Sequence, residues 1–439
     1  MEASGGAGGR ADASAEAGAG ASADASADAS AGGGTGSGGR GRRSVLRALA
    51  GVYFCVFGAM GVYAPFWPLF LVERGLSPVE ISHVMIAQPI LGMLIPPIWG
   101  VLADLSQARQ VLLRVALLGA AGGVLLFLIE GGFLICLLAA VVMGMLRAPI
   151  LPMVDAATHA ALGVRPASFS RTRIFGSVAF AIFALLGGWL GTKTTLSWLV
   201  VLVSVLFVLA AVFAWLVREV PELRRSGLLA RALTHTRGVR LLPLFVGSAF
   251  YYAGHATFDV LFGLHARALG LGADFVGLAW TIGVGAEIGL MLFAPWVLTR
   301  ISARRLLLFA ALVSVFRWGS LSVLTDGHSI LWTQPLHAVS FGLWFLAFTK
   351  LVQDGAPNEL RTTLQSIGSA FVGMGQIAGY AGGGWLFEQG GGAWAFRGAA
   401  VAAAVGMVTY LFLLASQGAD HGRFSVRHEG ARTDSGSKV

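Results

Sequence analysis

Apolar segments that are each about as long as a membrane is thick follow one another along almost the whole chain. A helix needs about 20 apolar residues to cross a bilayer. The protein has 439 residues, of which 56% are hydrophobic and only 12% are charged, whereas about a quarter of the residues in a soluble domain are charged. The sequence therefore predicts an all-α membrane protein, and its length allows roughly a dozen spans.

Twelve transmembrane helices are predicted, separated by polar connections. In chain order the predicted spans are 48–72, 79–103, 111–129, 132–154, 172–191, 195–217, 241–265, 274–297, 305–325, 330–349, 362–387 and 393–415. The longest polar connection after the N-terminal segment follows the sixth span and divides the chain into two halves. The predicted organisation is a cytoplasmic tail (1–44), a six-helix bundle (45–217), a basic cytoplasmic linker (218–240), a second six-helix bundle (241–415) and a cytoplasmic tail (416–439).

The N-terminal tail has the composition of a disordered segment. Up to residue 40 it contains mainly Ala, Gly, Ser and Asp, and no apolar residue larger than Ala follows Met1. Such a segment cannot bury enough surface to become ordered. The tail also lacks the pattern of a secretory signal, because the first apolar run begins late, at Val45, and continues far beyond a signal's length.

The distribution of basic residues predicts the orientation in the membrane. Of the 31 Lys and Arg residues, two lie within predicted spans and 25 fall on the side of the N-terminus. The remaining four, at the opposite side, are Arg74, Lys193, Arg267 and Arg397. Cytoplasmic loops carry an excess of Lys and Arg, so both termini are expected in the cytoplasm. The net charge of +9 is then a signal of topology, and we expect no binding to nucleic acid.

Three consecutive spans of the second half each carry one ionisable residue near the middle: Glu287, Arg317 and His337. Each such charge costs roughly 2.5 kcal/mol or more in a bilayer unless it is paired or hydrated. Ionisable residues inside a membrane usually mark ion or substrate pathways. We therefore expect these three residues to form the functional centre of a transporter.

Two basic loops occupy equivalent places in the two halves. GVLADLSQARQ follows the second span and VLTRISARRL follows the eighth, as a duplicated six-helix unit would give. The first loop resembles the loop signature of the major facilitator superfamily, with Gly100, Asp104 and Arg109 at the signature positions and Leu105 in place of the usual basic residue. These three residues are expected to form a cytoplasmic gating loop.

Further stretches resemble one branch of that superfamily, which contains 3-phenylpropionate permeases and relatives of lactose permease and nucleoside:proton symporters. They are YAPFWPLFLVERGLSPVEI, RTRIFGSVAF, WTIGVGAEIGL, FRW and LHAVSFG, within residues 48–415. The resemblance implies a fold of two pseudo-symmetric six-helix bundles with alternating access. It also implies proton-coupled uptake of a small organic solute.

The three central residues have distinct expected roles in proton coupling. Burial raises the pKa of a carboxyl and a nearby Arg lowers it, so Glu287 is expected to alternate between protonated and paired states. Arg317 stays charged and acts electrostatically. His337 either relays the proton, binds substrate or only forms packing hydrogen bonds. The alternative for the first two is a permanent Glu287–Arg317 ion pair that only fixes helix packing.

Other polar and aromatic residues in the spans are candidates for substrate binding. Tyr251, His255 and Asp259 recur every four residues on one helix face, as a cavity wall or outer gate, although Asp259 alternatively lies in solvent at the outer interface. Arg147, which is followed by Pro149 and Pro152, is expected to contact an anionic substrate or to pair with Asp155. The remaining candidates are Gln334, Gln365, Ser369, Gln376, Tyr380, Trp67 and Trp280.

The sequence contains no phosphate-binding loop, no HExxH and no paired-cysteine zinc spacing. No enzyme activity, cofactor or metal is therefore expected, and the energy for transport must come from an ion or solute gradient. We expect a monomeric proton-coupled symporter of the bacterial inner membrane, whose solute is an aromatic carboxylate or, nearly as well, a sugar or nucleoside. The alternatives are a proton-antiport exporter of drugs or sugars, and a membrane sensor that binds a solute without transporting it.

Overall fold

The computed structural model describes residues 36–162, 167–217, 241–357 and 359–433. Within these ranges the chain is almost entirely helical and contains no β-strand, which confirms the all-α prediction. The first 35 residues and the predicted linker at 218–240 lie outside the described residues. The first helix begins at Gly36, inside the segment whose composition predicts disorder.

The helices of the two halves have the following bounds. The first half contains α2 (Gly36–Glu73), α3 (Pro78–Ser106), α4 (Arg109–Leu125), the 3₁₀ turn η1 (Leu126–Leu128), α5 (Gly132–Arg147), α6 (Ile150–Leu162), α7 (Ala167–Lys193) and α8 (Ser197–Trp215). The second half contains α10 (Leu242–Ala268), α11 (Ala273–Arg300), α12 (Ala303–Leu321), α13 (Gly327–Trp332), the 3₁₀ turn η2 (Gln334–Leu336), the π-helix η3 (Ala338–Leu343), α14 (Trp344–Gly355) and α15 (Arg361–Thr433).

Among the described residues, nine helical segments are long and apolar enough to cross a membrane. One of them is the long α15, whose backbone leaves helical geometry at Gly390 and Gly391, between the predicted eleventh and twelfth spans. The helices α10 and α12 fall outside this group, and both carry ionisable residues that the sequence singles out. The protein is thus a multi-pass membrane protein, and a count of twelve spans stays a prediction for α10, α12 and the two parts of α15.

Local sequence explains where several helices begin and break. The hydroxyl of Ser77 accepts a hydrogen bond from the backbone N–H of Glu80, and the Glu80 carboxylate accepts one from the backbone of Ser77. This capping box satisfies two backbone donors at the start of α3. The predicted fourth span is interrupted between α5 and α6, at Pro149, because proline disrupts helical hydrogen bonding.

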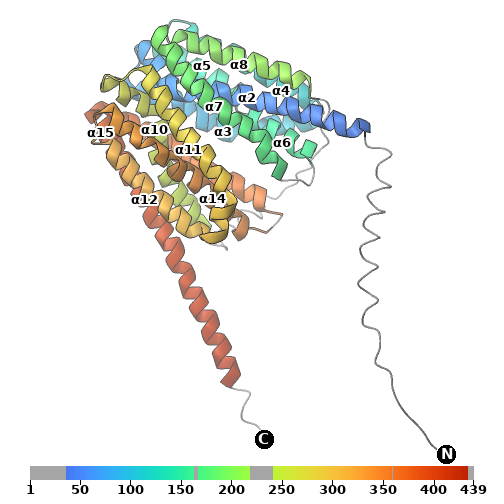
Figure 1. The fold of residues 1–439 in the computed structure, drawn as a ribbon, viewed down its shortest axis with the longest axis vertical. Helices are drawn as coiled ribbons and strands as arrows, with labels where there is room; N and C mark the ends of the chain where they lie inside the picture. Colours follow the sequence, from blue (N-terminus) through green and yellow to red (C-terminus); the bar gives the residue numbers. More distant parts are fainter. Residues whose placement is uncertain (1–35, 163–166, 218–240, 358, 434–439) are drawn as a thin grey trace, which may run out of the picture.

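The helices form two bundles that correspond to the two halves (Figure 1). In the first, α2 packs along α7 and α8, and α4 packs along α5 and α8. In the second, α15 packs along α10 and α12. The bundles meet where α7 contacts α11 and where α3 contacts the first part of α15. These two contacts are equivalent under an exchange of the halves, as a duplicated unit predicts.

These two contacts, which are the most extensive between the bundles, are closest near the helix ends that the predicted topology places outside the cell. At the first contact, the backbones of α7 and α11 approach each other at Gly188 and Gly277. The backbone N–H of Asp274 also donates to the Thr192 hydroxyl at 3.1 Å. At the second, Gly384 of α15 lies directly against Ser82 of α3. The absence of a Cβ on these glycines is what lets the bundles touch.

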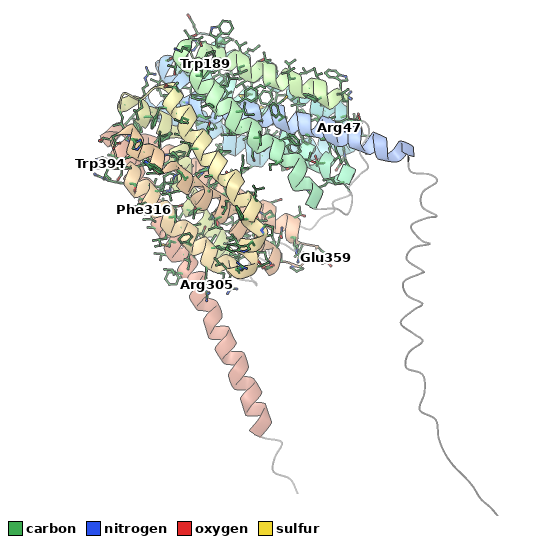
Figure 2. All side chains as sticks on the ribbon, in the orientation of Figure 1. Arg47, Trp189, Arg305, Phe316, Glu359 and Trp394 are labelled. Atoms are coloured by element: carbon green, nitrogen blue, oxygen red, sulfur yellow. The ribbon has the colours of Figure 1, made fainter. Side chains whose placement is uncertain are left out.

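The surface side chains differ between the two ends of the bundles. In Figure 2, Trp189 and Trp394 lie towards one end, whereas Arg47 and Glu359 lie towards the other. Both tryptophans are more than half exposed, as is typical of residues at a membrane–water interface.

Candidate functional site

Arg317 is the centre of a buried polar cluster in the second bundle. Its side chain comes from α12 and is only 1% exposed. The guanidinium donates to Gln334 Oε1 at 3.0 Å and to Ser340 Oγ at 3.1 Å, and lies 3.3 Å from His337 Nδ1. It also lies over the ring of Phe258, 4.5 Å from its centroid. Four neighbours on two other segments therefore hold this cation in place.

His337 connects Arg317 to Glu287. While Nδ1 of the imidazole faces Arg317, Nε2 lies 3.5 Å from Glu287 Oε2, a carboxylate that α11 supplies. The side chain of Glu287 is 19% exposed and that of His337 is 7% exposed. The structure thus brings together the three ionisable residues that the sequence singles out. The imidazole of His337 thus faces Glu287 with one ring nitrogen and Arg317 with the other.

The segment that carries Gln334 and His337 departs from the regular helix that the sequence predicts over 330–349. A 3₁₀ turn is followed by the π-helix η3. π-Helical turns are rare and are frequently found at functional sites. In this turn the backbone carbonyl of Ser340 accepts a hydrogen bond from the Tyr251 hydroxyl, which also bonds Ser314 Oγ at 2.8 Å. Helix α10 therefore fixes the irregular segment from the side.

Helix α10 adds a second imidazole and a second carboxylate to the cluster. His255 Nε2 lies 3.8 Å from Asp259 Oδ1, one turn along the same helix. The His255 ring stacks on His337 at a centroid distance of 5.5 Å and on Phe341 at 5.2 Å. The side chain of Asp259 is 20% exposed and lies within electrostatic range of Arg317. Asp259 is therefore a neighbour of the cluster, and the alternative of a solvated residue at the outer interface is wrong.

Trp280 closes the cluster on the side of the first bundle. Its ring lies 5.4 Å from Phe258 and 5.8 Å from Phe180 of α7. Trp280, Arg317, Gln334 and His337, among others, line a narrow crevice that has no room for a water molecule. The contacts of Arg317 in this structure are therefore direct.

Arg147 is the corresponding cation of the first bundle. Its guanidinium donates to Gln88 Oε1 of α3 at 2.9 Å from Nε and 2.5 Å from Nη2, and its centre lies 5.9 Å from the Tyr63 ring. The predicted Arg147–Asp155 pair is wrong, because Asp155 instead accepts a hydrogen bond from the Tyr53 hydroxyl at 2.5 Å. The break between α5 and α6 lies between Arg147 and Asp155.

The polar residues of α15 divide into exposed and buried members. Ser369 is exposed and its hydroxyl donates to the backbone of Gln365, whose own Oε1 is buried without a hydrogen-bond partner. Gln376 is half-buried and Tyr380 is buried. Tyr380 lies within electrostatic range of Arg147, so the stripe reaches the first bundle at this end.

The remaining candidates are Trp67 in the first bundle and the predicted gating residues Gly100, Asp104 and Arg109. Trp67 is fully buried in the first bundle, where its ring packs against Tyr63 at 4.5 Å and Phe127 at 4.8 Å. The Trp67 ring therefore holds the Tyr63 ring in position through this packing contact. Where α3 is followed by α4, Arg109 Nη2 at the start of α4 pairs with Asp104 Oδ1 near the end of α3 at 2.5 Å, whereas Gly100 of α3 has open space where a side chain would begin.

Sequence reasoning missed two partners of the buried cations, Gln88 and Ser340. Both are polar residues inside predicted spans, and a polar residue in an apolar span is the sequence signal that could have identified them. Gln88 precedes Pro89 in a span that otherwise contains few polar residues. An open hollow lies apart from both cations, on the surface between α7 and α11. It has about 660 Å³ and is lined mainly by apolar residues such as Leu186, with Asp274 at its edge.

Comparison with known proteins places most of the chain in one family. The family described as "MFS_1 like family" matches residues 46–398. The maltose permease of Geobacillus stearothermophilus is 27% identical over 367 residues, which are 82% of this chain and 92% of that protein. The probable 3-phenylpropionic acid transporter of Escherichia coli (strain K12) is 28% identical over 345 residues, 76% of this chain and 88% of that protein.

Solved structures share the fold at lower sequence identity. The nucleoside transporter NupG is 14% identical, with a TM-score of 0.72 over 84% of this chain and 98% of that chain. The human organic anion transporter MFSD10 (TETRAN) is also 14% identical, with a TM-score of 0.59 over 84% of this chain and 99% of that chain. These likenesses confirm the predicted fold.

Proposed function

Because the chain belongs to the MFS_1 like family and is a membrane transporter, we propose that it couples the uptake of a small organic solute to protons. The observation that supports this proposal is the Glu287–His337–Arg317 arrangement. A carboxylate and a fixed cation face opposite nitrogens of one imidazole. Protonation of Glu287 or of His337 therefore changes the net charge beside the buried Arg317.

The chemistry of the arrangement suits a reversible proton carrier. Arg317 remains charged and favours an ionised carboxylate nearby, whereas burial favours the protonated form. Glu287 is therefore the proposed proton carrier, and a small movement of α11 relative to His337 is proposed to change its surroundings during transport. In an alternating-access cycle such a movement accompanies the change in which side of the membrane the site faces.

The proposed solute contacts lie between the bundles. Arg147, which makes no ion pair among the described residues, is the proposed anchor for an anionic group. Tyr380, Gln376 and Trp280 are proposed to contact the remainder of the solute. One relative is named for a 3-phenylpropionic acid and another for maltose, so the proposal for this chain is a small organic solute, with an aromatic carboxylate preferred because of Arg147.

The proposed setting is the bacterial inner membrane, with a monomer whose two termini lie in the cytoplasm. The distribution of Lys and Arg supports this orientation. The loop with Asp104 and Arg109 then lies at the cytoplasmic face, where their ion pair is proposed to take part in gating.

The test is solute-induced proton movement in proteoliposomes that contain the purified full-length protein. A panel of aromatic carboxylates, sugars and nucleosides is added outside, and the external pH is recorded. We expect alkalinisation with at least one aromatic carboxylate and none with protein-free vesicles. Acidification during solute entry would indicate antiport, and binding of a solute without any flux would indicate a sensor. Either result would overturn the proposal.

A further inference from the structure

Two charged groups of opposite sign, Arg147 of the first bundle and Asp259 of the second, lie within electrostatic range of one tyrosine, Tyr380. We propose that the transported solute is bifunctional. It carries an anionic group that binds Arg147 and, across a flat or ring-shaped body, a hydrogen-bond donor such as a hydroxyl or ammonium that binds Asp259. This inference rests on the proposed transport function and specifies the class of solute.

The cationic side of the site has donor capacity that the protein does not use. Arg147 is half-buried and its described polar partner is the neutral Gln88. The Gln88 amide nitrogen Nε2 is buried beside the Tyr63 hydroxyl, without a hydrogen bond of good geometry. A buried donor without a partner costs about 1–3 kcal/mol. A carboxylate bound here would accept hydrogen bonds from both side chains.

The acidic side of the site has acceptor capacity that the protein uses only in part. Asp259 faces His255 at 3.8 Å, which is longer than a hydrogen bond, and its side chain is 20% exposed. The other titratable and charged groups around Asp259 are Arg317 of α12, Tyr252 of α10 and Tyr380 of α15. Asp259 is thus reachable, and a donor on the solute can occupy its free lone pairs.

The tyrosines connect the two sides. Tyr380 lies within electrostatic range of Arg147 and Tyr63 on one side and of Asp259 and Tyr252 on the other. Its position on α15, at the contact with α3, places it between the bundles. Phenol rings at this position offer flat apolar faces to a ring and hydroxyls to its substituents. A solute that reaches from Arg147 to Asp259 therefore passes Tyr380.

The two ends also explain how one solute links both bundles. A solute that has a carboxylate but no hydrogen-bond donor binds Arg147 and makes no contact with Asp259. A solute that has a donor but no carboxylate binds Asp259 and makes no contact with Arg147. The bifunctional solute alone contacts charged groups of both bundles at once. A ligand changes the balance between two conformations only by binding them with different affinity, and contacts to both bundles supply that difference.

The experiment compares the binding of four probes to purified full-length protein, measured by intrinsic tryptophan fluorescence. The probes are 3-(4-hydroxyphenyl)propionate with both groups, 3-phenylpropionate with the acid alone, 4-hydroxyphenethyl alcohol without the acid, and tyramine with an ammonium in place of the acid. We expect the hydroxylated acid to bind about tenfold or more tightly than the other three, because each charge-assisted hydrogen bond contributes in that range.

Matched variants assign the two ends of the probe. Arg147→Gln should remove the preference for the acid over the alcohol, and Asp259→Asn should remove the preference for the hydroxylated acid over 3-phenylpropionate. The control is Arg114→Gln on α4, which removes an arginine that lies over the Trp215 ring in the first bundle and should leave all four affinities unchanged. Circular dichroism of each variant verifies that it is folded.

Equal binding of the hydroxylated acid and 3-phenylpropionate, or no binding of the hydroxylated acid, would overturn the inference. So would an Asp259→Asn variant that keeps the full preference for the hydroxyl. These outcomes are separate from the proposed function, because equilibrium binding needs no pH gradient. If 3-phenylpropionate alone binds and drives proton uptake, the symport proposal stands and the bifunctional solute is wrong.

Discussion

The contact between α7 and α11 allows the alternating movement of the bundles to be tested by a single methyl group. At Gly277 an added Cβ would lie 2.4 Å from the carbonyl oxygen of Ala184 and 3.1 Å from the Cα of Gly188. Both neighbours are backbone atoms of the other bundle, so they cannot rotate away as a flexible side chain would. Gly277→Ala therefore forces the two bundles apart at this end.

The magnitude follows from the cost of overpacking. An extra methyl in a close-packed contact costs about 1–3 kcal/mol. That cost applies only while α7 and α11 touch, and it is relieved in any state in which this end opens. A difference of this size changes a two-state equilibrium by a factor of about 5 to 150. The open population of this end should therefore rise by at least about fivefold.

The assay is the rate at which a maleimide labels an engineered cysteine in the contact, introduced as Ala273→Cys. A Cβ on Gly191 would lie 3.3 Å from the Cβ of Ala273, and Ala273 is half-buried, so the residue is partly shielded while the bundles touch. The two native cysteines, Cys55 and Cys136, are buried. We expect Gly277→Ala to raise the labelling rate of the purified protein by about fivefold or more.

The control for this prediction is Gly285→Ala on the same helix, where an added Cβ meets no atom within 4 Å. It should leave the labelling rate unchanged. If Gly277→Ala labels at the rate of the parent protein, the contact does not limit opening and the reasoning is refuted. If both variants label faster to the same degree, the effect belongs to α11 generally and not to the contact.

Two further predictions concern the second bundle. Arg317→Met leaves Gln334 and Ser340 without a charged donor, which destabilises the fold by about 1–3 kcal/mol for each residue. It also removes an intramembrane charge that costs about 2.5–3.5 kcal/mol, so the unfolding temperature should change little while solute uptake is lost. Normal uptake by this variant would contradict the role assigned to Arg317. Asp326 caps α13 by accepting the Ser329 backbone N–H at 2.8 Å, and these hydrogen bonds lower its pKa. The capping contribution is therefore fully present above the ordinary carboxyl pKa of about 3.9 and is lost as the pH falls through the lower folded value, so Asp326→Ala should lower the unfolding temperature at pH 7 and should do so progressively less as the pH is lowered below about 3.9.

The centre of the site could be predicted from the sequence because placing an ionisable side chain in a bilayer costs free energy. Glu287, Arg317 and His337 stand out because each is an isolated ionisable residue in an otherwise apolar span, and a bilayer penalises such residues strongly. The prolines around residue 149 explain the break between α5 and α6, which interrupts the span predicted over 132–154. These features depend on local composition, which a single sequence displays.

The pairing of side chains between helices was not predictable in the same way. Arg147 pairs with Gln88, 59 residues away, and Asp155 with Tyr53, 102 residues away. Local spacing instead suggests Arg147 and Asp155 as neighbours on one helix. The choice between these partners depends on how the helices rotate and cross, and that is decided by the packing of the whole bundle.

The backbone of the segment around His337 was also beyond the reach of the sequence pattern. The apolar periodicity predicts a regular helix, whereas the structure has a 3₁₀ turn followed by a π-helix. Tertiary hydrogen bonds from Arg317 and Tyr251 to Ser340 stabilise this geometry. Such bonds come from other helices and leave no local signature.

The central claim is that Glu287 carries the coupled proton, and the most direct measurement is the response of solute transport to a pH gradient in the Glu287→Gln variant. Proteoliposomes are tested for two activities with the same solute, exchange at equal pH and accumulation against a concentration gradient under an imposed pH gradient. Glutamine keeps the size and hydrogen-bonding capacity of the side chain but cannot ionise. The account predicts that exchange continues and accumulation is abolished. A variant that still concentrates the solute in response to the pH gradient would contradict it.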